Sequence, residues 1–150
     1  MASTKKILTS LHGKLVGIAH DGKLVVAGRT ATTADDAGVI VKPQGTAGEL
    51  NATGTLTAAL VSTGIVTSTT GAAVVATVDT GTAMDTALSG TVAIGDGFEW
   101  SAINTGASAF TVTAAASHTL VGSGVVATVT SGRFFSKRTA ANTWATTRLA

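Results

Sequence analysis

The sequence predicts an all-β protein, with a sandwich or jelly-roll-like body over residues 51–150 and an extended N-terminal arm over residues 1–50 that contains a β-hairpin. Three observations favour this fold class. The β-branched residues Thr and Val are abundant, and their stiffness at χ1 favours strands over helices. The 18 glycine residues supply turns. Short apolar runs recur every 8–12 residues or so, a spacing typical of a sandwich or barrel-like fold rather than a βαβ sheet.

The arm is expected to contain one hairpin. Two apolar runs, residues 14–19 and 23–27, flank His20-Asp21-Gly22, and Asp-Gly between such runs is a strong hairpin signal. A further short strand is expected at 39–42, before Pro43, and residues 44–54 are rich in Gly, Thr and Ala and resemble a linker. An isolated hairpin is marginally stable in water, so we expect the arm to pack on the body or on a neighbouring chain.

The body is predicted to consist of short strands with a single helical turn. That turn is expected at residues 83–88, where Met84 and Leu88 lie four positions apart on one face. The strands before the last hairpin are expected at residues 64–67, 74–78, 98–103, 110–113, 118–121 and 125–129. The chain should end in a hairpin of residues 133–137 and 143–149 around a turn at 139–142.

Two tryptophans are expected in the core. Phe98, Trp100 and Ala102 alternate with polar residues, which places their side chains on one face of a strand. Trp144 lies across the terminal hairpin from Arg133-Phe134-Phe135-Ser136-Lys137-Arg138. That basic and aromatic run is the nearest approach to a nucleic-acid-binding stripe, but in a hairpin its aromatic residues are expected in the core and its basic residues on the outer face. We therefore expect no nucleic-acid partner.

The sequence offers little material for catalysis or for a cofactor. The chain has no Cys, and His12, His20 and His118 lack the spacing of metal ligands. Asp35 and Asp36 are adjacent, so on an extended chain they point apart instead of converging as an acid/base pair. We expect no catalytic residue, no cofactor and no metal, and therefore no enzyme. No apolar run reaches the roughly 20 residues of a membrane-spanning helix, so no membrane partner is expected.

Charge is segregated along the chain. Residues 1–42 hold six Lys or Arg and three Asp, for a net charge of +3. Residues 43–132 hold five acidic residues and no Lys or Arg, and residues 133–150 hold four basic residues. This pattern is compatible with contact between a basic arm and an acidic neighbour, or with uneven sampling in a chain with only 12% charged residues.

A family resemblance covers residues 55–150. It rests on the order of Gly, Asn and aromatic positions in the segments 60–67, 92–100, 103–106, 110–113, 120–122, 131–134 and 141–144. This order resembles the β-rich C-terminal domain of tailed-bacteriophage virion proteins, particularly capsid decoration (cement) proteins and head or tail fibre components. The resemblance carries no catalytic residues. It implies an oligomer, commonly a trimer, on the particle surface.

The resemblance therefore leads us to expect a structural virion protein, assembled in the host cytoplasm, that binds the outer surface of the phage head and stabilises it as a homotrimer. Its partners would be the major capsid protein and other copies of itself. The contact residues expected in the arm are Lys5, Lys6, Lys14, Lys23, Arg29 and Lys42. The alternative is a receptor- or glycan-binding knob of a head or tail fibre, with Trp100 and Trp144 as candidate sugar contacts.

Overall fold

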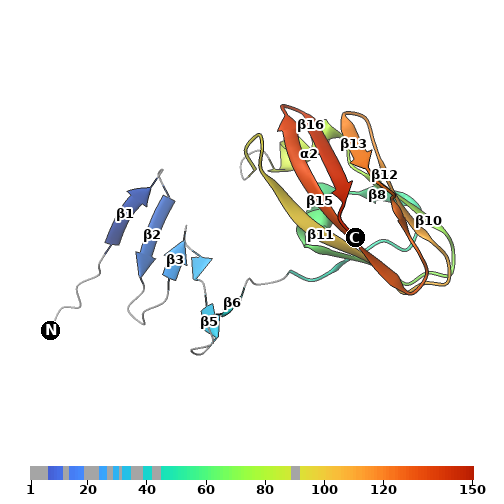
Figure 1. The fold of residues 1–150 in the computed structure, drawn as a ribbon, viewed down its shortest axis with the longest axis horizontal. Coiled ribbons are helices and arrows are strands. Elements are labelled where there is room, and N and C mark those ends of the chain that lie inside the picture. Colours follow the sequence, from blue (N-terminus) through green and yellow to red (C-terminus); the bar gives the residue numbers. More distant parts are fainter. Residues whose placement is uncertain are drawn as a thin grey trace. The chain divides into compact units, whose positions relative to one another are not determined.

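The computed structural model divides the chain into two units, Met1–Pro43 and Gln44–Ala150 (Figure 1). It describes residues 45–88 and 92–150 in full, and the backbone of the strands that lie between residues 7 and 41. Strands predominate in the described residues, and the two helices are short. The prediction of a mostly-β protein is therefore confirmed.

The first unit contains the short strand predicted at 39–42, as β6, and more strands than the predicted hairpin. Its antiparallel sheet has the order β1-β2-β3-β4, and a separate pair joins β5 to β6. The predicted hairpin corresponds to the β2–β3 pair, in which Ile18 lies opposite Leu24, while His20-Asp21-Gly22 lies outside the described residues. The bounds are β1 Ile7–Leu11, β2 Lys14–Ile18, β3 Leu24–Val26, β4 Arg29–Thr30, β5 Thr32–Ala34 and β6 Val39–Val41.

The second unit begins earlier than the predicted body, because β7 pairs with β9 and Leu50 packs against the core. Its elements are β7 Gly48–Glu49, β8 Gly54–Leu56, α1 Ala58–Ser62, β9 Ile65–Ser68, β10 Val74–Val78, α2 Gly81–Leu88, β11 Gly97–Asn104, β12 Phe110–Ala114, β13 His118–Val121, β14 Val125–Val126, β15 Thr130–Ala140 and β16 Thr143–Arg148. Every strand predicted for the body is present, although β14 is shorter than expected. Helix α2 contains the predicted turn, and α1 was not predicted.

The chain of the second unit passes back and forth between two sheets. The smaller sheet has the order β14-β12-β10-β8, and the larger sheet has the order β13-β16-β15-β11-β9-β7. Successive strands from β7 to β15 alternate between the sheets, and β7, β9 and β11 pair in parallel, as do β8, β10 and β12. The antiparallel strands β14 and β15 end this parallel stack.

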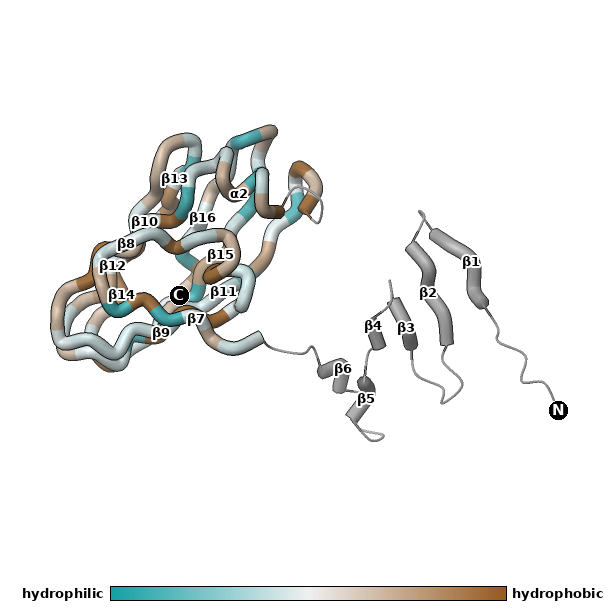
Figure 2. Tube along the Cα trace, turned by 180° about the vertical axis from the view of Figure 1, so that it is seen from behind, coloured by the Kyte–Doolittle hydropathy of each residue, from teal (hydrophilic) through white to brown (hydrophobic). Residues whose placement is uncertain are grey.

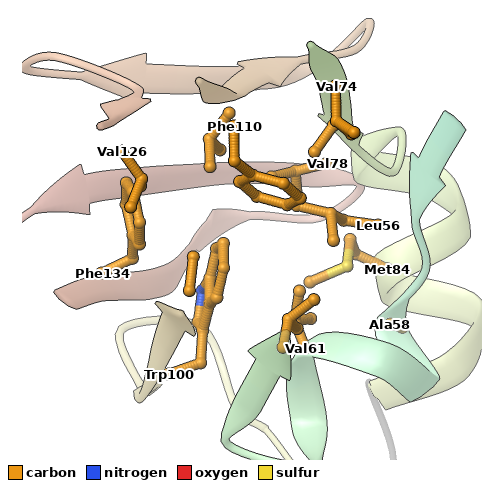
Figure 3. Close-up of a cluster of buried hydrophobic side chains, with 14 of the residues drawn as sticks. Leu56, Ala58, Val61, Val74, Val78, Met84, Trp100, Phe110, Val126 and Phe134 are labelled. Carbon is orange, nitrogen blue, oxygen red and sulfur yellow. The ribbon is translucent and has the colours of Figure 1, made fainter. Parts of the chain in front are cut away.

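The core of the second unit lies between the two sheets and the helices (Figure 3). Trp100 and Phe134 of the larger sheet stack with ring centroids 4.7 Å apart, and both are buried. Phe110 comes from the smaller sheet, and Met84 comes from α2. Burying a side chain of this size stabilises a fold by about 1.5–3 kcal/mol. The core positions predicted for Trp100 and Trp144 are confirmed.

Candidate interaction surface

The predicted contact residues of the arm fall in the first unit. Lys14 is the first residue of β2 and Arg29 is the first residue of β4. The structure describes only the backbone at these two positions. Lys5, Lys6, Lys23 and Lys42 lie outside the described residues. Their role in contacting a partner therefore stays a prediction.

Three of the four basic residues near the C-terminus contact groups of their own unit, namely Arg133, Arg138 and Arg148. Arg133 forms an exposed ion pair with Glu99, with 2.5 Å between Nη2 and Oε2. Arg148 lies over the ring of Phe134, 5.1 Å from its centroid, and donates to the backbone carbonyl of Val125. These contacts do not test the expectation that the chain has no nucleic-acid partner, which stays a prediction.

Arg138 and Asp85 form a nearly buried ion pair that ties α2 to the terminal hairpin. Arg138 donates to both carboxylate oxygens of Asp85, at 2.8 and 2.6 Å. The indole N–H of Trp144 and the backbone N–H of Asn142 donate to the same carboxylate, each at 2.7 Å. These donors, with Arg138 contributing most, lower the pKa of Asp85 to about 2. The ion pair joins α2 to the terminal hairpin. Each carboxylate oxygen of Asp85 already accepts two hydrogen bonds, so neither is free to take up a proton from another group.

Histidine 118 is also engaged within the fold. Its Nδ1 lies 3.0 Å from the backbone carbonyl of Asp79, and its Nε2 lies 2.8 Å from the hydroxyl of Thr146. Within the part of the chain that the structure describes, no group of three or more His, Cys, Asp or Glu could hold a metal ion. His12 and His20 lie outside the described residues.

The outer face of the smaller sheet is uncharged and β-branched. We call it the Thr/Val face; it comprises Thr55, Val75, Thr77, Thr111, Thr113 and Val125. Its side chains form rows across the strands: Thr77 lies opposite Thr55 and Thr113, and Thr111 lies opposite Val75 and Val125. The hydroxyls of Thr77 and Thr113 are 2.9 Å apart and hydrogen-bonded.

The apolar members of this face are open to solvent. Val75 is 42% exposed and Val125 is 50% exposed, whereas their chain neighbours Val74 and Val126 are buried. This difference follows from the alternation of side chains along a strand. Figure 2 shows that the tube of the second unit is mainly white and brown, with short teal stretches, in keeping with its few charged residues.

The outer face of the larger sheet differs from the Thr/Val face in its charge. Glu99, Arg133 and Lys137 are exposed there on β11 and β15. Phe135 lies opposite Glu99 and is half-buried. Charged side chains resist desolvation, so of the two outer faces the Thr/Val face is better suited to close contact with another protein.

The sequence predicts three of the strands that carry the Thr/Val face, β10, β12 and β14, but neither β8 nor the face itself. The alternation in residues 74–78 and 110–113 was the available signal. It becomes a surface only when β10 and β12 are known to be neighbours in register. Strands of similar composition carry no local mark of their partner, because register depends on contacts that are distant in sequence.

Comparison with known proteins does not assign a family. No family model matches the chain, and neither the curated proteins nor the solved structures contain a significant match. The resemblance to phage virion proteins therefore rests on the residue pattern alone. Neither helix among the described residues has the length and apolar character needed to cross a bilayer.

Proposed function

We propose that this protein is a capsid decoration (cement) protein, a structural virion protein that binds the outer surface of a phage head as a homotrimer. In this proposal the second unit is a sandwich or jelly-roll-like body and the first unit is an arm that reaches along the shell. The observation that carries the proposal is the Thr/Val face, an uncharged sheet surface with exposed valines. The buried ionisable groups Asp85 and His118, by contrast, are engaged in holding the fold.

The proposed arm would contact the major capsid protein through its basic residues. Residues 1–42 carry a net charge of +3, which favours approach to an acidic shell surface. The contact residues proposed are Lys5, Lys6, Lys14, Lys23, Arg29 and Lys42. A protein that binds the assembled shell but not its free subunits stabilises the shell by mass action.

The proposed contact between copies uses the Thr/Val face. Thr and Val are stiff at χ1, so their side chains lose little conformational freedom when a partner covers them. No charged side chain among the six residues of the face has to be stripped of water. Such a face suits a homo-oligomeric interface, which is more apolar than the average protein surface.

Co-sedimentation with purified empty heads from a panel of tailed phages tests the proposed function. We expect the full chain to pellet with at least one type of head and the chain lacking residues 1–42 to stay in the supernatant. Circular dichroism of the shortened chain serves as the control that its body is folded. Undiminished pelleting of a folded shortened chain would refute the arm as the contact, and a full chain that binds no head would refute the proposed function.

The alternative of a glycan-binding knob loses its candidate contacts. Trp100 is 1% exposed and Trp144 is 0% exposed, so neither ring can stack on a sugar. Both indole N–H groups are also used inside the fold, by Ser136 and by Asp85 respectively. A glycan array probed with the labelled full chain tests this alternative, and cement function predicts no saturable binding.

A further inference from the structure

A buried chain of hydrogen bonds crosses the second unit from Trp100 to Asp79. The indole Nε1 of Trp100 lies 2.9 Å from the hydroxyl of Ser136, which lies 2.8 Å from the hydroxyl of Thr146. Thr146 lies 2.8 Å from Nε2 of His118, and Nδ1 of His118 lies 3.0 Å from the carbonyl of Asp79. Ser136 and Thr146 are 0% exposed and His118 is 7% exposed.

When His118 is neutral, the two ends of this chain fix the direction of every hydrogen bond in it. An indole N–H can only donate, and a backbone carbonyl can only accept. Ser136 therefore accepts from Trp100 and donates to Thr146, and Thr146 in turn donates to Nε2 of His118. The Nδ1–H of His118 donates to the carbonyl of Asp79. The chain is complete when His118 is neutral and carries its proton on Nδ1.

A second proton on His118 breaks this order. Nε2–H would become a donor, and Thr146 would have to accept from it. The hydroxyl protons of Thr146 and Ser136 would then have one acceptor too few, because Ser136 still accepts from Trp100. A buried donor without an acceptor destabilises the folded state. All the hydrogen bonds from Trp100 to Asp79 can therefore form in only one protonation state of His118.

The location of His118 gives this chain a structural consequence. His118 opens β13, an end strand of the larger sheet that pairs with β16. The turn between β12 and β13 is hydrogen-bonded to the segment between β10 and α2. The N–H of Ala115 donates to the carbonyl of Val78, and the N–H of Gly81 donates to the carbonyl of Ala116. The side chain of His118 adds a bond from the first residue of β13, in the larger sheet, to Asp79, which follows β10 of the smaller sheet, and these contacts together form the junction between the two sheets.

Few charged groups oppose the effect of burial on His118. Burial lowers the pKa of His118 below its usual value, while the bond to the Asp79 carbonyl and the Asp79 carboxylate act in the opposite direction. That carboxylate also accepts from the backbone N–H of Thr80. On the packed elements α2 and β15, Asp85 and Arg138 neutralise each other, and Lys137 of β15 is exposed. Arg148 of β16 is directed to backbone carbonyls and to Phe134.

We propose that His118 is a proton-sensitive latch, which holds β13 and the junction between the two sheets closed while it is neutral and releases them when it binds a proton. This inference does not depend on the proposed function. Since the pKa of His118 is lowered on folding, the latch is intact above the unfolded value of about 6.5 and weakens as the pH falls through the folded value. The unfolding equilibrium constant should rise by up to about tenfold per pH unit in that window.

Two measurements on the full chain test the latch. Long-range ¹H–¹⁵N correlation spectra at pH 7.5 should show His118 with its proton on Nδ1, and a proton on Nε2 would overturn the proposal. Amide hydrogen exchange at pH 5.5 and 7.5, corrected for intrinsic rates, should show loss of protection in β13 before β11 and β15. Equal loss in all three strands, or no loss, would also overturn it.

Urea unfolding of variants from pH 8 to pH 5 separates His118 from the other histidines. His118→Gln should lose the pH dependence between pH 6.5 and 5, whereas the double variant His12→Gln/His20→Gln should keep it. If His118→Gln does not fold, Thr146→Val provides the second variant: it removes the hydroxyl that donates to Nε2 of His118, and with it the conflict between hydroxyl protons, so its pH dependence should be weaker than that of the full chain. Unchanged pH dependence in His118→Gln, or its loss in the double variant, would refute the latch.

Discussion

At the scale of single residues, the acid stability of the second unit should depend on Asp85. Its pKa of about 2 lies below the usual aspartate value of 3.8, so its contribution to stability is present above about pH 4 and is lost as the pH falls towards 2. Asp85→Asn should therefore flatten the dependence of the melting temperature on pH in this range. It should also lower stability at pH 7, because the largely buried Arg138 loses its counter-ion.

Thermal unfolding of both proteins at pH 7, 4 and 2.5 measures this effect. Glu99→Gln is the matched control, since it breaks the exposed pair with Arg133, and an exposed pair contributes about 0–1 kcal/mol. Equal melting temperatures for Asp85→Asn and Glu99→Gln at pH 7 would contradict the structural role assigned to the Asp85–Arg138 pair.

Also at the residue scale, the neighbours Phe134 and Phe135 should respond very differently to truncation. Phe134 is 0% exposed and stacks on Trp100, whereas Phe135 is half-buried on the outer face. Phe134→Ala should lower the free energy of unfolding by about 3–5 kcal/mol. Phe135→Ala should cost clearly less, on the order of 1 kcal/mol. Urea titrations of the two variants measure the difference. Similar losses of unfolding free energy would mean that Phe134 and Phe135 do not lie on opposite faces of β15 as described.

At the scale of elements, the sequence predicts where strands lie better than it predicts which strands pair. The strands 74–78 and 118–121 are confirmed residue for residue, because a run of β-branched residues between turn residues is a local signal. The parallel stacking of β8, β10 and β12 was not predicted, since no local feature marks a strand's partner. Helix α1 was missed because it spans Ala58–Ser62 alone, too short to show a helical period.

The start of α2 gives a prediction at the element scale. Replacing Gly by Ala inside a helix normally favours the helix by about 1 kcal/mol. A Cβ at Gly81, however, would lie 2.2 Å from the carbonyl oxygen of Asn142 and 2.3 Å from that of Ser117. Both contacts are with backbone, so Gly81→Ala should destabilise the protein by about 1–3 kcal/mol. Gly71→Ala is the control, because nothing lies within 4 Å of its added Cβ. A more stable Gly81→Ala in urea would show that α2 and the hairpin are not packed this closely.

At the scale of the whole molecule, the mostly-β character was predictable and the candidate interaction surface was not. Composition and turn spacing suffice for a mostly-β chain, since they reflect local preference. The Thr/Val face combines residues from Thr55 to Val125, and it exists only through the order of four strands. Asp85 follows the same rule, because the donors to its carboxylate come from the terminal hairpin, more than 50 positions away.

The proposed contact between copies leads to the last prediction, also at the molecular scale. Thr111→Lys places a charge in the middle of the Thr/Val face, between Val75 and Val125. Burying that charge in an interface costs several kcal/mol, so the dissociation constant of the oligomer should rise by on the order of 100-fold or more. Thr119→Lys is the control, because it places the same charge at an exposed position of β13 in the larger sheet. Light scattering over a range of concentrations measures the mass of each protein.

The mass also distinguishes between two ways of using the face. A face that meets its own copy across a two-fold axis produces a dimer, whereas a closed trimer requires it to meet a different surface of the next copy. A trimer that Thr111→Lys dissociates and Thr119→Lys does not would place the Thr/Val face in a head-to-tail interface. A dimer with the same response would keep the face as the contact but rule out the homotrimer. An oligomer that withstands Thr111→Lys would exclude the face from the contact between copies, whatever the outcome of the binding experiment with phage heads.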